Sequence, residues 1–352
     1  MSLSVGIIGL PNTGKSTLFE AITRKQVDRA NYPFCTIEPN LGTIAVPDER
    51  LDALAKIFPK DKKIPAIVEF VDIAGLIAGA SQGEGLGNKF LAHIREVSAI
   101  LYVLRGFNKE SIINTLERID PWFEKEILDT ELALKDIETI EKRIIALEKE
   151  IKASQSEALR EKEILDHFIE LLKNGKFLVD NIEDDFSWEL IKKYQLLTGK
   201  PRLYLINANK DEVDHGILGK FEGHPLIILD ALIELEACDL TAEERQSLEL
   251  DQSGLDELIR SSYRLLDLIT FFTIGRNEIR AWTLRRGQTA PQAGGVIHTD
   301  FENNFIKAEI IKWNDLIEAG NFAVARQKGL IRTEGREYQI QDGDVVEIKS
   351  GI

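Results

Sequence analysis

The stretch from Leu3 to Ile22 constrains the fold more than any other part of this 352-residue chain. A run of branched apolar residues of strand length leads into GLPNTGKS at residues 9–16, and the residues that follow favour a helix. This is the pattern G-x-x-x-x-G-K-[ST] between a strand and a helix, the context in which it is informative. The sequence therefore predicts a phosphate-binding loop within an α/β fold.

Each position of this loop has a chemical reason. Gly9 and Gly14 permit the tight turn that brings several backbone N–H groups to one phosphate. The helix that opens at Lys15 directs its positive N-terminal end to the same point. Lys15 supplies a mobile charge for the β- and γ-phosphates, and Ser16 supplies a hydroxyl for Mg²⁺. The expected nucleotide-binding residues of the loop are Asn12, Thr13, Gly14, Lys15, Ser16 and Thr17.

Two later segments fit the same site. Residues 31–40, NYPFCTIEPN, predict a loop with aromatic anchors, in which Thr36 binds Mg²⁺ and senses the γ-phosphate. A strand over 67–71 ends in Asp72, which we expect to hold Mg²⁺ through water. Gly75 follows and can offer its N–H to the γ-phosphate. With the loop lysine, Gly75 completes the predicted catalytic groups.

Two residues near these motifs leave alternatives open. The side-chain carbonyl oxygen of Asn12 could complete a K⁺ site beside the phosphates, although an ordinary turn asparagine explains this residue equally well. Cys35 immediately precedes Thr36, so its oxidation could disturb Mg²⁺ binding. The alternative for Cys35 is a small buried hydrophobe.

Further buried strands are expected at 99–104, 203–206 and 226–229. Strands that alternate with helical stretches behind a phosphate loop indicate a doubly wound, mostly parallel sheet. The chain between the strands at 99–104 and 203–206 is far longer than a crossover helix needs. Apolar residues there step by three and four along two successive helices, which predicts a helical hairpin inserted at about 122–198.

The character of the chain changes after residue 265. Strand-like segments are expected at 270–274, 279–283, 306–311, 338–340 and 345–348, and residues 287–295 are predicted to be a turn-rich connector. The expected division is a nucleotide-binding domain over 1–274, which contains the hairpin, and a small β domain over 275–352.

Composition narrows the partners and the compartment. A net charge of −15 argues against free DNA as the main partner, but not against a local basic face that docks on RNA. The two cysteines suit a reducing cytosol. We see neither a signal peptide nor an apolar run of membrane-spanning length. A cytoplasmic monomer without membrane contact is expected.

With these motifs laid out, the chain resembles the Obg-like ATPases of the YchF subfamily. The resemblance rests on GLPNTGKST at 9–17, NYPFCTIEPN at 31–40, DIAGLIAGAS at 72–81, GEGLGNKFL at 83–91 and RAWTLRRGQTAPQAGGVIHTDFE at 280–302. It implies an OBG-type P-loop domain, a coiled-coil insertion and a C-terminal TGS domain, which is a ubiquitin-like β-grasp module. It also implies Mg²⁺-dependent hydrolysis of ATP in preference to GTP, and association with ribosomes.

Base choice is where the chain departs from the family pattern. The family's Asn-x-x-Glu motif falls on Asn207, Ala208, Asn209 and Lys210, with lysine in the glutamate's place. The base loop falls on 230–232. A lysine only donates hydrogen bonds and guanine presents donors, so this register favours ATP. The rival register, Asn209 to Glu212, supplies a carboxylate and favours GTP.

The turnover is expected to be slow. Leu76 stands where many GTPases carry a glutamine that orients the attacking water, and a leucine cannot hydrogen-bond that water. Three functions therefore compete: a slow ATPase switch that binds ribosomes and acts in translation, a GTPase of the same architecture, and a nucleotide-gated ribosome adaptor with negligible hydrolysis.

The phosphate-loop assignment can be tested with Lys15→Ala. The substitution removes the charge that compensates the β- and γ-phosphates, and charged hydrogen bonds contribute roughly 1.5–3 kcal/mol each. Nucleotide affinity or turnover should fall about tenfold or more, as measured by equilibrium titration and phosphate release. Near-normal binding and hydrolysis would refute the assignment.

Overall fold

The computed structural model describes residues 4–27, 40–73 and 93–351, without residues 60, 110, 115, 117, 153–155, 249, 251–252 and 276. The chain forms two compact units. The first comprises Met1–Arg24, Glu38–Gly42 and Phe70–Leu255, and the second comprises Lys25–Ile37, Thr43–Glu69 and Asp256–Ile352. The sequence-based boundary near residue 275 stays a prediction.

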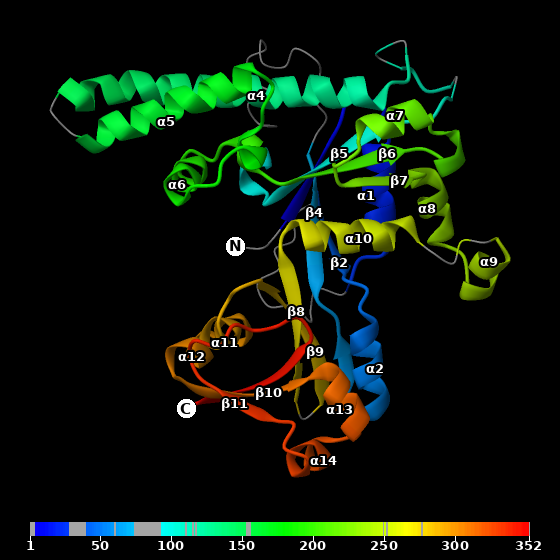
Figure 1. Cartoon of the computed structure of the whole chain (residues 1–352). Helices are drawn as coiled ribbons and strands as arrows, with labels where there is room; N and C mark the ends of the chain where they lie inside the picture. Colours follow the sequence, from blue (N-terminus) through cyan, green and yellow to red (C-terminus); the bar gives the residue numbers. More distant parts are fainter. Residues whose placement is uncertain are drawn as a thin grey trace. The chain divides into compact units, whose positions relative to one another are not determined.

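One six-stranded sheet carries the phosphate loop (Figure 1). Its strands, in sheet order, are β2 (Leu41–Ala45), β4 (Ile67–Asp72), β1 (Ser4–Ile8), β5 (Ala99–Arg105), β6 (Arg202–Asn207) and β7 (Leu226–Leu229). The β1–β5, β5–β6 and β6–β7 pairs are parallel. Every residue of β1, β5 and β6 is buried, as expected for strands covered on both faces. Five strands lie where the apolar runs predicted them; β2 was not predicted.

The first unit also contains helices. They are α1 (Lys15–Arg24), α4 (Pro121–Lys152), α5 (Ser156–Lys173), α6 (Asp185–Lys193), α7 (His215–Lys220), α8 (Ala231–Ala237) and α9 (Ala242–Ser247). Short 3₁₀ turns, η3 (Leu178–Asp180), η4 (Leu197–Gly199) and η5 (Lys210–Glu212), complete the connections. Alternate side chains of β5, such as Tyr102 and Leu104, share one apolar core with Leu128 and Leu132 of α4. The long helix is therefore anchored on the sheet at its N-terminal end.

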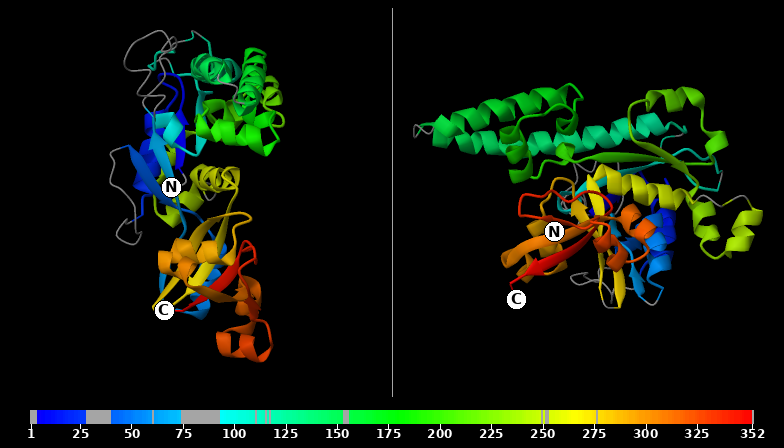
Figure 2. Two further views of the ribbon diagram at one scale, coloured as in Figure 1. Left: turned by 90° about the vertical axis from the view of Figure 1, so that its left-hand side faces the viewer. Right: turned by 60° about the horizontal axis from the view of Figure 1, so that its bottom comes forward.

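The predicted helical insertion is confirmed. Helices α4 and α5 lie side by side and project from the sheet (Figures 1 and 2). Ile140, Leu147 and Phe168 are fully buried in the same core as the sheet residues. Arg143 on α4 donates to Glu161 on α5, so an ion pair also joins the two helices.

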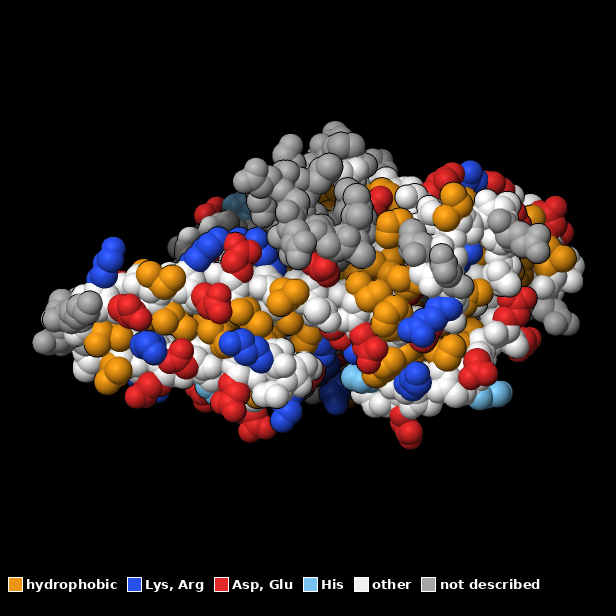
Figure 3. Space-filling view, turned by 90° about the horizontal axis from the view of Figure 1, so that it is seen from above, with side chains coloured by type: hydrophobic (Ala, Val, Ile, Leu, Met, Phe, Trp, Pro, Cys, Tyr) orange, Lys and Arg blue, Asp and Glu red, His pale blue; other side chains and the backbone are white. Residues whose placement is uncertain are grey.

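Figure 3 shows hydrophobic side chains between acidic and basic ones along the hairpin. The exposed large apolar residues on it are Leu134, Ile145 and Leu159. Among the described residues, no helix is long and apolar enough to cross a bilayer.

The second unit contains the other six-stranded sheet. Its order is β11 (Arg332–Glu334), β10 (Phe305–Lys312), β12 (Asp344–Ser350), β8 (Leu268–Ile274), β9 (Glu278–Arg285) and β3 (Lys62–Ile64). Strands β8 and β9 form an antiparallel hairpin, and β12 runs parallel to β8. The helices are α2 (Glu49–Ile57), α10 (Gly254–Leu265), α11 (Ala290–Ile297), α12 (Thr299–Asn303), α13 (Trp313–Ala319) and α14 (Phe322–Gln327). Strand β3 comes from the N-terminal half of the chain, which the strand pattern did not predict.

Two local predictions in this unit were wrong. Residues 287–295 include the first part of helix α11, because Thr289 and Gln292 cap its N-terminus reciprocally and Pro291 lies in its first turn. The glycine pair that suggested a turn packs instead against Phe301 and Glu302, and a Cβ at Gly294 would lie 3.3 Å from the backbone of Phe301, closer than ordinary contact. Residues 338–340 make only an isolated bridge between Gln339 and Thr289.

A buried carboxylate stabilises the return from the hairpin to the sheet. Asp136 on α4 is 1% exposed. It accepts hydrogen bonds from the backbone N–H of Leu197 at 2.9 Å, and from the N–H and hydroxyl of Thr198 at 2.8 and 2.7 Å. Burial raises the pKa of Asp136 to about 6, although these bonds and the charge of Arg95 oppose the shift.

Asp136→Ala should destabilise the chain by about 3 kcal/mol, because it leaves two buried N–H groups without their acceptor. Denaturant unfolding of the variant and wild type measures the difference. Asp166→Ala is the control, since Asp166 is half-exposed in a surface pair with Lys162 and its removal should cost at most about 0.5 kcal/mol. Equal losses in both variants would contradict the role of Asp136.

Candidate functional site

The phosphate loop connects β1 to α1 and is held tightly. A Cβ atom at Gly9 would lie 2.4 Å from the carbonyl oxygen of Val103 on the neighbouring strand. Gly14 has φ +96°, and a Cβ there would lie 2.1 Å from Nδ2 of Asn207. Both positions therefore require glycine, one for the close approach of β5 and one for the backbone conformation.

Lys15 is folded back onto the loop. Its Nζ donates to the carbonyl oxygen of Leu10 at 2.6 Å, and the residue is buried. Burial lowers the pKa of Lys15, while the carboxylates of Asp72 and Glu124 oppose that shift. The ammonium group thus lies in a field of two carboxylates and rests on a carbonyl, a position from which it can turn toward a phosphate.

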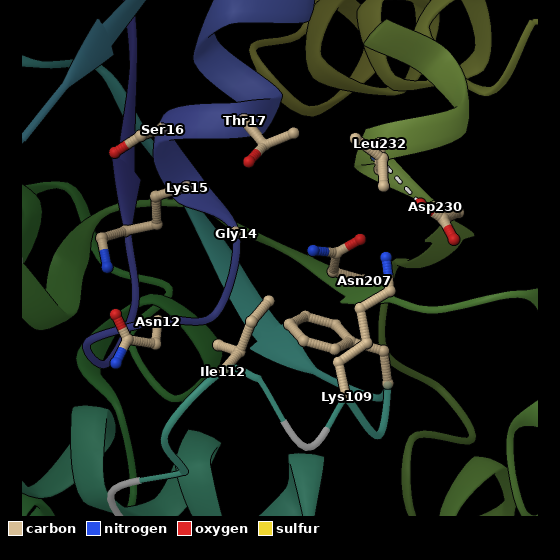
Figure 4. Close-up of a pocket in the computed structure, with 11 residues that line it drawn as sticks. Asn12, Gly14, Lys15, Ser16, Thr17, Lys109, Ile112, Asn207, Asp230 and Leu232 are labelled. Atoms are coloured by element: carbon tan, nitrogen blue, oxygen red, sulfur yellow. Dashed lines mark hydrogen bonds between the residues drawn. The ribbon is translucent and has the colours of Figure 1, made fainter. Parts of the chain in front are cut away.

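A cavity of about 420 Å³ opens beside the loop (Figure 4). Its lining comes from three parts of the first unit: the phosphate loop and α1, the segment after β5, and the ends of β6 and β7. The lining residues are Asn12, Gly14, Lys15, Ser16, Thr17, Phe107, Lys109, Ile112, Asn207, Asp230 and Leu232. Such a volume, with the phosphate loop on one side and Phe107, Ile112 and Leu232 among its other walls, suits a nucleotide.

Asn207 joins the parts of this cavity. Its Nδ2 donates to the carbonyl oxygen of Thr13 at 2.9 Å, and its Oδ1 accepts from the N–H of Ala231 at 2.9 Å. The side chain is buried at the end of β6 and lies between the loop and the start of α8 (Figure 4). One amide therefore sets the distance between the phosphate end and the β7–α8 connection, where Asp230 caps the helix.

The remaining residues of the predicted base motif do not line the cavity. Ala208 is buried and donates its N–H to the carbonyl of Leu229. Asn209 caps the short turn η5, and Lys210 lies exposed within it. Glu212, the carboxylate of the rival register, lines a separate hollow with Gly106 and Pro121.

Several predicted residues lie outside this cavity or outside the described residues. Thr13 is buried, and its hydroxyl donates to Leu10. Asp72 ends β4; burial raises its pKa and the charge of Lys15 lowers it. Thr36, Cys35, Gly75 and Leu76 are not among the described residues, so their predicted roles stay predictions.

Sequence reasoning missed Phe107, Lys109 and Ile112. They follow β5, whose C-terminal end lies at the same edge of the sheet as the ends of β1 and β6. Ligands of parallel α/β sheets bind at this edge. The position after a predicted strand was therefore a usable signal, although nothing in the residue types indicated it.

The residues present fit Mg²⁺ together with phosphate. Ser16 lines the cavity at the start of α1 and offers a hydroxyl, and Asp72 is a half-buried carboxylate whose charge acts on Lys15. Mg²⁺ usually takes one or two protein oxygens and fills its other positions with water and phosphate. The part of the chain that the structure describes contains no cluster of three or more His, Cys, Asp or Glu that could hold a metal.

Comparison with known proteins places the chain in a family. A model described as "50S ribosome-binding GTPase" matches residues 4–149, and a model for the YchF-GTPase C-terminal region, described as a protein of unknown function, matches residues 268–350. The chain is 44% identical to the "Ribosome-binding ATPase YchF" of Bacillus subtilis over the whole length of both. The chain belongs to the YchF family.

Other YchF proteins are similar to this chain along almost its whole length. The Mycoplasma genitalium protein of the same name is 42% identical over 99% of this chain and all of its own length. A solved structure described as that of the Schizosaccharomyces pombe YchF GTPase covers 99% of this chain and 98% of its own, with a TM-score of 0.86 and 36% identity. The YchF fold therefore extends over both units and the helical insertion.

Glu124 makes the free energy of unfolding of this YchF chain depend on pH. The residue is 2% exposed in the first turn of α4, and its Oε2 accepts the N–H of Arg105 at 2.8 Å. Burial raises the pKa of Glu124 to about 7, while the Arg105 bond and the charges of Arg105 and Lys15 oppose the shift. The folded protein therefore binds this proton more tightly than the unfolded chain, so stability falls as the pH rises from about 4.5 through 7.

Glu124→Gln should remove this pH dependence, because the amide is neutral and keeps an oxygen for the Arg105 N–H. Relative to wild type, the variant should gain up to about 3 kcal/mol of unfolding free energy between pH 5 and pH 8. Denaturant unfolding at both pH values measures the change. A difference between variant and wild type that is the same at pH 5 and pH 8 would contradict the assignment.

Proposed function

We propose that this chain is a ribosome-binding ATPase that acts as a slow nucleotide-dependent switch in translation or its regulation, in the cytoplasm. The observation that carries the proposal is the pair of hydrogen bonds made by the side-chain amide of Asn207. They join the phosphate loop to the start of α8 on the other side of a nucleotide-sized cavity. The names of relatives that match along the whole chain, ribosome-binding ATPases, support it.

In this proposal the charge on Lys15 does the main catalytic work. Lys15 leaves the carbonyl of Leu10, to which it now donates, and pairs with the β- and γ-phosphates. The loop N–H groups and the N-terminus of α1 stabilise the same charge. Ser16 and Thr36 would hold Mg²⁺, which Asp72 would help to bind through water, and the bound ion would neutralise phosphate charge. Gly75 would offer its N–H to the γ-phosphate.

We favour ATP over GTP as the substrate. Asn207, the first residue of the family register, lines the cavity, whereas Glu212 of the rival register lines a different hollow. Phe107, Ile112 and Leu232 offer apolar walls for a base. Asp230 Oδ1 accepts the N–H groups of Leu232 and Ile233, so this carboxylate is already engaged in capping α8. GTP remains the alternative, because one family model and the Schizosaccharomyces pombe structure are described as GTPases.

The distribution of charge supports docking on the ribosome despite the net charge of −15. The second unit contains 20 Lys and Arg and 20 Asp and Glu, so all of the excess negative charge belongs to the first unit. A neutral unit meets little long-range repulsion from RNA phosphates. The strand order β9-β8-β12-β10 with helix α11 supports the finer assignment of this unit as a β-grasp, TGS-type module, and we propose that the hairpin is the family's coiled-coil insertion.

Asn12 is proposed as a K⁺ ligand. Its φ of 63° and the bond from its Nδ2 to the carbonyl of Ile113, at 3.2 Å, orient the amide beside the cavity. The carbonyl oxygen Oδ1 then remains available for a cation, which would supply charge that Leu76 cannot.

Titration of ATP and GTP against wild type and Glu212→Ala decides the base. ATP should bind more tightly, and Glu212→Ala should leave the preference unchanged because Glu212 lies outside the cavity. Tighter GTP binding that is lost in Glu212→Ala would show that the rival register is correct.

Hydrolysis by the wild-type protein in K⁺ and in Na⁺ buffers tests the role of Asn12, since equal rates in both would remove the proposed K⁺ site.

Co-sedimentation with ribosomes, combined with phosphate release, tests the switch. Ribosome binding should differ between the ATP-bound and nucleotide-free protein, and ribosomes should accelerate phosphate release. Nucleotide-dependent binding without any hydrolysis would instead support the adaptor. Binding that ignores nucleotide would contradict a switch of either kind.

A further inference from the structure

Arg105 is a buried arginine whose bonds go to a loop. It ends β5 and is 2% exposed. Its Nε donates to the carbonyl of Phe107 at 3.2 Å, Nη1 to Ile113 at 3.1 Å and Nη2 to Ile112 at 3.0 Å. The guanidinium carbon also lies 4.5 Å from the centre of the Phe107 ring. One side chain thus binds both ends of the segment 107–113.

This segment is one wall of the nucleotide cavity. Phe107, Lys109 and Ile112 all line it, and the segment is referred to below as the wall. The described residues of the wall form no helix or strand, and a turn bond joins the N–H of Ile112 to the carbonyl of Lys109. Its position therefore depends on side chains that reach it from outside.

Two neighbouring groups extend the contact. Asn12 of the phosphate loop donates to the same Ile113 carbonyl that Arg105 binds. On the other side, the backbone N–H of Arg105 donates to Glu124 in the first turn of α4. The phosphate loop, the wall and the start of the helical hairpin are therefore joined through Arg105 within the first unit.

The chemistry of this contact requires arginine. A guanidinium presents five N–H donors in a rigid plane and can bind three carbonyls in different directions while its face lies on a ring. A lysine ammonium at the same place keeps the positive charge but is a single point on a flexible stem. Arg105→Lys thus preserves the charge and removes the geometry.

We infer that Arg105 is a positioning residue of the nucleotide site, which holds the wall where Phe107, Lys109 and Ile112 complete the cavity, and which connects that wall to α4. The inference rests on the proposed nucleotide-binding function of the cavity. Lys15 and Ser16, which act on the phosphates, lie on the loop and not on the wall. Loss of the wall's position should therefore weaken nucleotide binding more than it slows the chemical step.

Calorimetric titration of ATP and steady-state phosphate release compare wild type with Arg105→Lys. The variant should bind ATP at least tenfold more weakly and show a raised KM, while kcat stays within about twofold of wild type.

Arg202→Lys is the matched control. Arg202 is also buried and lies over a phenylalanine, Phe177, but it begins β6 at the opposite end of the same parallel pair and binds Asp180. The Arg202→Lys variant should unfold at a lower temperature than wild type and keep the wild-type affinity for ATP.

Unchanged ATP affinity in Arg105→Lys would overturn the inference, and so would equal losses of affinity in both arginine variants, because these would reflect stability alone. If Arg105→Lys does not fold, hydrogen exchange on wild type decides. ATP should then slow exchange in the wall and in the first turn of α4 together, and protection of the phosphate loop alone would overturn the inference. Wild type that binds GTP but not ATP would contradict the proposed base, and the same variants would then be measured with GTP.

Discussion

The geometry of the nucleotide cavity depends on one side-chain amide. Asn207 donates to Thr13 in the phosphate loop and accepts from Ala231 at the start of α8, so it bridges segments more than two hundred residues apart. An aspartate could not donate to the Thr13 carbonyl, and a threonine would be too short to carry both bonds in opposite directions. Gly14 is required for the same reason, because any side chain there would occupy the space of this amide. Sheet, loop and helix start are therefore held in one arrangement before any ligand binds.

Four buried charges in the first unit are met by backbone groups. Lys15 rests on a carbonyl, Arg105 on three carbonyls, and Asp136 and Glu124 accept backbone N–H groups. Backbone dipoles at fixed positions satisfy an ion in a low-dielectric interior without a second mobile charge. Exposed pairs on the hairpin, such as Lys162 with Asp166, contribute far less, whereas the buried Glu161 pairs with Arg143 between the two helices. The two kinds of charge thus have different tasks: the buried ones hold segments in place, and the exposed ones keep the projecting helices solvated.

Helix α11 and the wall show where sequence patterns fail. The stretch after Gly287 contains glycine, proline and small residues, which are typical of a turn, yet Thr289 and Gln292 cap a helix there. Its glycines serve close packing against α12, a need that becomes visible only when that neighbour is placed. The wall residues Phe107 and Ile112 belong to no sequence motif. Their carbonyl groups are held by the side chain of Arg105. In both cases the deciding contact lies outside the local pattern.

The sequence by itself determined the phosphate loop, five of the six strands of the first sheet, the helical insertion and the family. These features follow from short-range rules: residue types at fixed spacing, apolar period and strand–loop–helix order. Only the tertiary structure decided which residues share the cavity, placing Phe107 and Lys109 in it and Asn209, Lys210 and Glu212 outside it. It also added β3 to the second sheet from the far half of the chain. The physical reason is that a cavity and a sheet edge are formed by segments that are far apart in the sequence and come together through packing. The spacing of residues within one segment does not say which other segment will lie beside it.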